Sequence, residues 1–228
     1  MKYENMIEGI FLERPNRFIA IVLINGKEET VHVKNTGRCR ELLIKGVTVY
    51  LRHETNPARK TKYSLISVVK NNMLINMDSQ IPNYVVYEAL QENKIHGINA
   101  EAIKKEVQYD NSRFDIYFKS SGKESFMEVK GVTLEENGFA MFPDAPTQRG
   151  AKHLKELIKA KEEGYGAYIF FLIQMDKINA FGPNYERDTI FSEALEEAYK
   201  KGVQILCYNS KVSTDSISIG ESIQLVFK

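Results

Sequence analysis

The first third of the chain alternates hydrophobic and polar positions with a period of two, which is typical of strands that bury one face. The predicted strands are residues 17–24, 29–33, 47–54 and 63–70. Asn25-Gly26 separates the first two and is the preferred pair for a two-residue hairpin turn. A short helix is predicted at 38–44, after Gly37. Several short strands and one small helix indicate a small barrel or sandwich.

The rest of the chain combines helical periodicity with short apolar runs. Helices are predicted at 82–94, 147–164 and 188–202, and strands at 106–110, 113–119, 125–134, 167–174 and 203–209. Thr147 is a predicted N-cap and Gly164 a predicted stop. The order helix, three strands, helix, strand is typical of an α/β sandwich. The change of pattern near Ser79–Pro82 predicts two domains, 1–80 and 81–228.

Composition is that of an ordinary globular protein: of 228 residues, 43% are hydrophobic and 27% charged. Cys39 and Cys207 are far apart and lack metal-site spacing, so we expect free thiols in a reducing compartment. The longest apolar run, residues 167–173, is too short to span a membrane, and the first residues contain no run suited to a signal peptide. These features predict a soluble cytoplasmic protein with no membrane partner.

Charge is unevenly distributed, although the net charge is only +1. Residues 1–80 contain 13 Lys and Arg against 8 Asp and Glu, and residues 34–62 contain 8 against 2. Such a local excess favours a phosphate backbone as partner. The candidate nucleic-acid contacts are Arg38, Arg40, Arg59, Lys60, Lys62, and, near the start of the helix at 147–164, Arg149, Lys152 and His153. The alternative is ordinary solvated charge.

Candidate chemistry lies in 124-ESFMEVKGVTL-134. On a strand, Glu128 and Lys130 point to the same face. The turn at Ser121-Gly122 makes 113–119 its antiparallel neighbour, so Asp115 is expected to face Glu128. Two close carboxylates repel unless a cation lies between them. The sequence therefore predicts a site for Mg²⁺ or Mn²⁺, since Mg²⁺ is commonly held by one or two carboxylates, waters and phosphate oxygens.

The remaining members of this site are less constrained by pattern. Lys130 is expected to orient an attacking water or to stabilise charge developing on a phosphate. Glu88, on the helix before the strands, is a third candidate metal ligand. The alternative for Asp115, Glu128 and Lys130 is a surface ion-pair cluster, and for Glu88 a solvent-facing helix residue.

The arrangement of Asp115 with Glu128-x-Lys130 in this element order resembles the PD-(D/E)xK nuclease superfamily. The segments 36-TGRCRELL-43, 59-RKTKYSL-65, 112-SRFDIYF-118, 128-EVKGVTL-134 and 142-FPDAPTQRGAKHLKEL-157 resemble the sugar fermentation stimulation protein A (SfsA) family. The resemblance covers nearly the whole chain in order. It implies a small OB-like β-barrel followed by a restriction-endonuclease-like αβββαβ domain, so that the fold class is α/β, or α+β for the chain as a whole. It also implies DNA binding.

Two functions remain open on this basis. The first is a metal-dependent nuclease acting on DNA or RNA, with Asp115, Glu128 and Lys130 catalytic. The second is a catalytically inactive, nonspecific DNA-binding or regulatory protein, which the family name links to sugar metabolism, maltose in particular. No helix-turn-helix pattern is present, which argues against sequence-specific repression. An enzyme acting on sugars has little support, because Asp115 and Glu128 are expected to lie too close together for a glycosidase.

Overall fold

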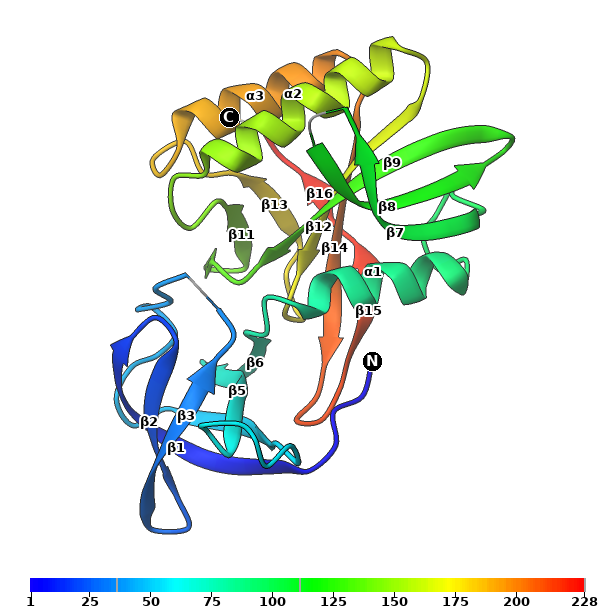
Figure 1. The fold of residues 1–228 in the computed structure, drawn as a ribbon. Helices are drawn as coiled ribbons and strands as arrows, with labels where there is room; N and C mark the ends of the chain where they lie inside the picture. Colours follow the sequence, from blue (N-terminus) through cyan, green and yellow to red (C-terminus); the bar gives the residue numbers. More distant parts are fainter. Residues whose placement is uncertain (36, 111, 228) are drawn as a thin grey trace. The chain divides into compact units, whose positions relative to one another are not determined.

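The computed structural model describes residues 1–35, 37–110 and 112–227 (Figure 1). The chain forms two compact units. The first consists of Met1–Ile81 with the short segments Gln174–Asp176 and Ser210–Ser218. The second consists of Pro82–Ile173, Lys177–Asn209 and Ile219–Lys228.

The first unit contains a closed five-stranded barrel. Its strands are β1 Met6–Asn16, β2 Ile19–Ile24, β3 Lys27–Val33, β4 Thr48–His53 and β5 Tyr63–Lys70, and β6 Met73–Asn76 pairs beside β5. They follow the order β3-β2-β1-β4-β5-β6, and parallel pairing of β3 with β5 closes the barrel. Alternate residues of β2 are buried, as the period of two predicts. This architecture confirms the expected OB-like barrel.

The turn between β2 and β3 is the predicted hairpin. Asn25 and Gly26 both have positive φ, 50° and 79°, which a two-residue type I′ turn requires. Strand β1 was not predicted, because Gly9 and Pro15 are residue types that weaken a strand pattern. Gly9 is there for close packing: a Cβ atom on it would lie 2.6 Å from Cγ1 of Val22.

The predicted helix at 38–44 is wrong. Residues 40–42 form a turn and the others are irregular, with the backbone N–H groups of Leu42 and Leu43 both donating to the carbonyl of Cys39. Cys39 has a φ of 45°, in the left-handed region, which a residue within a right-handed helix cannot adopt. Its side chain is buried, while Arg38 and Arg40 on either side are exposed.

The second unit is a mixed α/β domain with three helices among its described residues. The helices are α1 Ile81–Gln91, α2 Gln148–Glu162 and α3 Thr189–Lys200. The strands are β7 Glu101–Tyr109, β8 Ser112–Ser120, β9 Lys123–Val132, β10 Glu135–Glu136, β11 Phe139–Phe142, β12 Gly166–Ile173, β13 Ala180–Pro183, β14 Gln204–Val212, β15 Ile217–Ser222 and β16 Gln224–Leu225. The order of α1, β7–β9, α2 and β12 confirms the expected αβββαβ core.

Two sheets organise this domain. The larger has the order β15-β14-β12-β9-β8-β7, in which β12 runs parallel to both β9 and β14, and β8 runs antiparallel to β7 and β9. A smaller sheet has the order β10-β11-β13-β16. The β8–β9 turn has positive φ at Ser121 and Gly122, as its sequence predicts.

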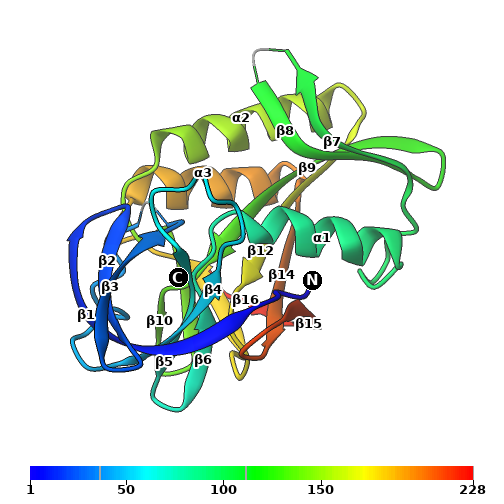
Figure 2. The same ribbon diagram turned by 60° about the horizontal axis from the view of Figure 1, so that its bottom comes forward.

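Helices α2 and α3 lie side by side in both Figure 1 and Figure 2, and α2 packs on β12. Thr147 is the N-cap of α2 and accepts a hydrogen bond from the N–H of Gly150 at 3.1 Å, which confirms the predicted helix start. Asp188 caps α3 through the N–H of Phe191 and also accepts from the N–H of Thr147. The two helix starts are therefore fixed to each other, which sets the position of α2 over the sheet.

Candidate functional site

The candidate site begins where β8 and β9 separate. Their pairing runs from Ser120↔Lys123 to Ile116↔Met127 and stops there. At the next position, Oδ2 of Asp115 accepts the backbone N–H of Val129 at 2.9 Å, so a side chain replaces the main-chain ladder. Beyond this point β9 continues through Val132 paired with β12. The two strands form a fork, and Asp115 lies at its base.

Glu128 comes from β9 at the same fork and is 3% exposed. Its Oε1 atom accepts a hydrogen bond from Nζ of Lys130 at 2.6 Å, as expected for side chains on the same face of a strand. The Nδ1 atom of His153, from α2, lies 2.5 Å from the same oxygen. The other oxygen, Oε2, is buried and has no hydrogen-bond partner among the described residues.

His153 is a member of this site, which sequence reasoning missed. It is buried and faces Glu128, instead of lying with the exposed Arg149 and Lys152. Nε of Arg149 donates to Nε2 of His153 at 3.4 Å. In the neutral imidazole the proton therefore belongs on Nδ1, the nitrogen nearest Glu128. The spacing of 25 residues between Glu128 and His153 carries no local pattern that could have revealed the contact.

The pKa values of the two carboxyl groups, Asp115 and Glu128, are shifted in opposite directions. Burial, together with the negative charge of Glu128, raises the pKa of Asp115 above its usual range. Burial also acts to raise the pKa of Glu128, but His153 and Lys130 outweigh it, and the net pKa is lowered. The two pKa values are therefore shifted in opposite directions, and the negative charge of Glu128 opposes the ionisation of Asp115.

The donor set fits a hard divalent cation. Two carboxylates interact electrostatically at the fork, and one of them has a buried oxygen without a partner. Within residues 1–35, 37–110 and 112–227, no three His, Cys, Asp or Glu side chains come together as a ligand cluster. Two carboxylates are nevertheless sufficient for Mg²⁺, which usually keeps several waters and takes oxygens from phosphate.

Helix α1 contributes Asn83 to the site. Its Nδ2 atom donates to Oδ1 of Asp115 at 2.8 Å, so Asp115 has a partner on each oxygen. Glu88 follows Asn83 by more than one helical turn, and it interacts electrostatically with Lys94. The assignment of Glu88 as a metal ligand stays a prediction.

The predicted nucleic-acid residues of the first unit fall into two groups, and Lys152 belongs to the second unit. Arg38 and Arg40 line a pocket with Arg14, Arg17 and Leu43. Arg59 instead donates to Ser64 and pairs with Glu54, while Lys60 and Lys62 are exposed nearby in sequence. Lys152 on α2 pairs with Glu156 at 3.6 Å. Their binding roles stay predictions.

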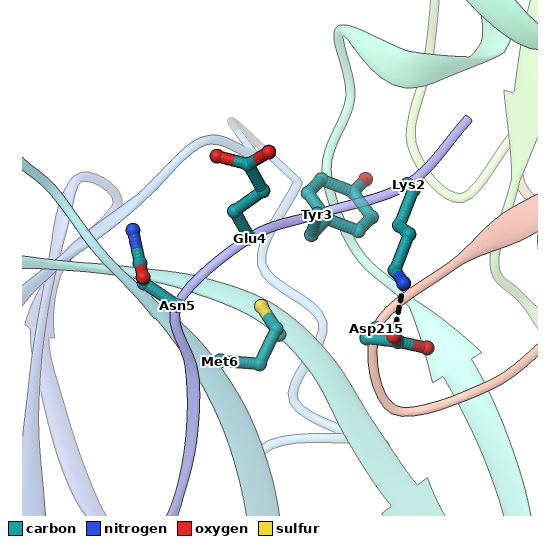
Figure 3. A pocket seen from close by; sticks show the side chains of 6 residues that line it. All are labelled: Lys2, Tyr3, Glu4, Asn5, Met6 and Asp215. Atoms are coloured by element: carbon teal, nitrogen blue, oxygen red, sulfur yellow. Dashed lines mark ion pairs between the residues drawn. The ribbon is translucent and has the colours of Figure 1, made fainter.

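A second pocket in the first unit surrounds the N-terminal segment and is shown in Figure 3. It has a volume of about 500 Å³ and is lined by Lys2, Tyr3, Glu4, Asn5, Met6 and Asp215. Figure 3 shows Lys2 directed at Asp215, and their charged atoms are 3.7 Å apart. None of the predicted site residues lines it, and its mixed charges provide no focused site for an anion or a cation.

Both cysteines are buried, and neither is part of a disulfide among the residues that the structure describes. Across the described residues, every helix falls short of the length and apolar character that crossing a bilayer demands.

Comparisons with known proteins agree along the whole chain. The family model described as SfsA N-terminal OB domain matches residues 12–77, and that described as Sugar fermentation stimulation protein RE domain matches residues 80–216. A sugar fermentation stimulation protein homolog of Alkaliphilus oremlandii is 52% identical, and 100% of each chain is covered. One from Desulfitobacterium hafniense is 55% identical, with 98% of this chain and 97% of the relative covered.

Among solved structures, Pyrococcus furiosus SfsA in complex with Ca²⁺ superposes with a TM-score of 0.88 at 29% identity. The superposition covers 100% of this chain and 98% of that one.

Proposed function

The chain belongs to the sugar fermentation stimulation protein family, and from that premise we propose that it is a metal-dependent nuclease that hydrolyses phosphodiester bonds of DNA or RNA. Asp115 and Glu128 hold a divalent cation, Mg²⁺ or Mn²⁺, and Lys130 completes the catalytic group. The basic first unit and the exposed charges of α2 hold the strand.

The observation that carries this proposal is the buried Oε2 atom of Glu128, which has no hydrogen-bond partner among the described residues. A second carboxylate, that of Asp115, interacts electrostatically with Glu128. A buried carboxylate oxygen without a hydrogen bond is costly, and a cation removes that cost. The Ca²⁺ bound by the relative from Pyrococcus furiosus supports the same interpretation, since Ca²⁺ and Mg²⁺ both prefer oxygen ligands.

The side chains of this chain have separable roles in the reaction. The cation, when bound, would polarise the phosphate and lower the pKa of a coordinated water. Asn83 and the N–H of Val129 fix the Asp115 carboxylate in one orientation. Lys130 and His153 both engage Oε1 of Glu128, which leaves Oε2 for the cation. Lys130 is 18% exposed, so its ammonium is accessible to neutralise charge on a phosphate oxygen or to orient a water.

A nuclease assay on an Asp115→Ala variant tests the proposal. Parent and variant are incubated with single- and double-stranded DNA and RNA, in Mg²⁺, Mn²⁺ or EDTA. We expect cleavage by the parent that depends on metal and is abolished in the variant, with strand binding largely retained. Equal cleavage by the two proteins contradicts the proposed site.

The family name supports a second function, a DNA-binding or regulatory protein connected with sugar metabolism and without catalysis. The same assay separates the two. Binding by the parent without cleavage, in every metal, favours the regulatory function and leaves Asp115 and Glu128 as structural charges.

A further inference from the structure

An arginine-lined pocket in the barrel unit points to a ligand of its own. It has a volume of about 330 Å³ and is lined by Arg14, Pro15, Asn16, Arg17, Arg38, Arg40 and Leu43. Two segments form it, one from the end of β1 to the start of β2, and one following β3. The volume is near the lower end of pockets that take small ligands, about 300–1,000 Å³.

Arg14 ties the two walls of this pocket together. Its Nη1 atom donates to the carbonyl oxygens of Gly37 at 2.8 Å and Arg38 at 2.6 Å. Its Nη2 atom donates to those of Arg17 at 2.8 Å and Asn35 at 2.6 Å. All four acceptors are neutral, so Arg14 positions the backbone of both walls and keeps its own positive charge.

The other three arginines are directed outward by the backbone that Arg14 holds. Arg38 and Arg40 flank Cys39, whose left-handed backbone and buried side chain leave both neighbours exposed. Arg17 is exposed and its Cζ atom lies 4.9 Å from the ring centroid of Phe18. In the part of the chain that the structure describes, Arg17, Arg38 and Arg40 form no ion pair. Their charges are therefore available to an anion.

The exposed Phe18 ring adds a second kind of contact. It is 46% exposed, and it lies next to Arg17. Aromatic rings beside a positively charged groove are the platforms on which bases of a single strand stack. Guanidinium groups bind phosphate through paired, planar hydrogen bonds. The pocket thus offers three guanidinium groups for a phosphate, and Phe18, which contacts Arg17 but does not line the pocket, offers a ring for the neighbouring base.

We propose that this pocket binds a phosphate group of a single-stranded nucleic acid, through Arg17, Arg38 and Arg40, with the adjacent base stacked on Phe18. Arg14 is a positioning residue, because it acts through the backbone of the other three. The proposal deepens the function proposed above, on which the identity of the strand rests, by assigning a phosphate subsite to the barrel.

Strand binding in EDTA tests this assignment without any cleavage. A fluorescent single-stranded oligonucleotide is titrated with the full-length parent, with Arg38→Gln/Arg40→Gln, with Arg17→Gln and with Phe18→Ala. Lys27→Gln is the matched control, since Lys27 carries an exposed charge on the same unit but does not line the pocket. Thermal unfolding of each protein confirms that it is folded.

We expect the double variant to bind about tenfold or more weakly, and the slope of log K against log salt to fall by about 0.7 for each phosphate that the variant no longer neutralises. Phe18→Ala is expected to weaken binding with an unchanged salt slope, because it removes stacking alone. Pocket variants that bind like Lys27→Gln overturn the assignment. If Arg38→Gln/Arg40→Gln does not fold, the Arg17→Gln slope decides between the same two outcomes.

Competition identifies the source of the phosphate. Inorganic phosphate, a nucleoside monophosphate and unlabelled oligonucleotide are each added to the parent complex. An oligonucleotide that competes far better than the monophosphate supports a strand subsite, and equal competition overturns it in favour of a free-nucleotide site. The result is independent of catalysis: a parent that binds here and does not cleave contradicts only the nuclease proposal.

Discussion

Glu54 in the barrel and Glu128 at the β8–β9 fork are both largely buried carboxylates with basic neighbours, yet they differ in what is left over. Both oxygens of Glu54 accept from Nη2 of Arg52, at 2.8 and 2.9 Å, and Ser64 adds a further hydrogen bond. Glu128 concentrates its two basic partners on one oxygen and leaves the other without one among the described residues.

This difference is what we expect between a structural ion pair, at Glu54, and a ligand-binding carboxylate, at Glu128. Charge pairs occur throughout a protein and are weak evidence of function. A buried acceptor left unsatisfied is rare and calls for a further group. At Glu128 that unsatisfied atom lies beside Asp115, whose pKa burial and the Glu128 charge raise. The pKa values of Glu54 and Glu128 are both lowered by their basic neighbours, so the two sites differ in the second carboxylate and the unsatisfied oxygen, which accompany Glu128 alone.

The largest expected effect is on catalysis. Glu128→Gln is expected to reduce the cleavage rate by about 10³-fold or more, because it removes a charged ligand worth several kcal/mol to the transition state. Glu54→Gln is the matched control and is expected to keep the parent rate. The measurement is single-turnover cleavage with saturating metal. Similar losses in both variants break the comparison.

Metal binding is expected to stabilise the protein through the site of Asp115 and Glu128 and not through Glu54. Mn²⁺ at about a hundred times its Kd contributes about 2.7 kcal/mol to the unfolding free energy of a protein that binds it only when folded. The Tm of the parent and of Glu54→Gln therefore rises by a few degrees. Glu128→Gln and Asp115→Ala are expected to show no rise. A normal shift in Asp115→Ala would place the metal elsewhere.

The satisfied carboxylate should carry stability instead. Glu54→Gln is expected to lower the free energy of unfolding at pH 7 by about 1–3 kcal/mol, because Arg52 loses its charged partner. The pKa of Glu54 is lowered from its usual value of 4.5, so its stabilising effect is present above that pH and is lost as the pH falls through the folded-state pKa. Urea unfolding at pH 7 and at pH 3 should therefore show that the difference in unfolding free energy between the parent and Glu54→Gln is smaller at pH 3.

A smaller effect on catalysis than that of Glu128→Gln is expected from the residue that orients Glu128. His153→Asn retains an amide nitrogen near the position of Nδ1, whereas His153→Gln places one nearer Nε2. We expect His153→Gln to lose about 10–100-fold in metal affinity or kcat, as for partners that orient metal ligands, and His153→Asn to lose less. Equal losses would mean that the contact with Glu128 is not what matters, and unchanged Tm values exclude a folding defect.

Local patterns were sufficient for much of this site. Alternation along a strand placed Glu128 and Lys130 on one face, and the Ser121-Gly122 turn brought Asp115 to the neighbouring strand. The αβββαβ order followed from periodicity, and the Thr147 cap from its residue type. Each of these depends on residues within a few positions of one another.

What the sequence could not reveal depends on packing between distant segments. Asn83 reaches Asp115 across 32 positions, and the placement of His153 follows from how α2 lies on the sheet. The mistaken helix at 38–44 has a local cause: composition favours a helix there, but Cys39 adopts a left-handed backbone that no residue type other than glycine or asparagine announces. That same backbone is what exposes Arg38 and Arg40.

The hydrogen bond from the Val129 N–H to Asp115 has a consequence for the history of the family. A backbone donor in this position needs an acceptor, so a descendant that lost this carboxylate would have to close the fork or recruit another side chain. Loss of the Asp115 carboxylate would then change the backbone hydrogen bonding where β8 and β9 separate. Family members that lack this carboxylate should therefore differ in how these two strands pair, even where every other side chain of the site has been kept.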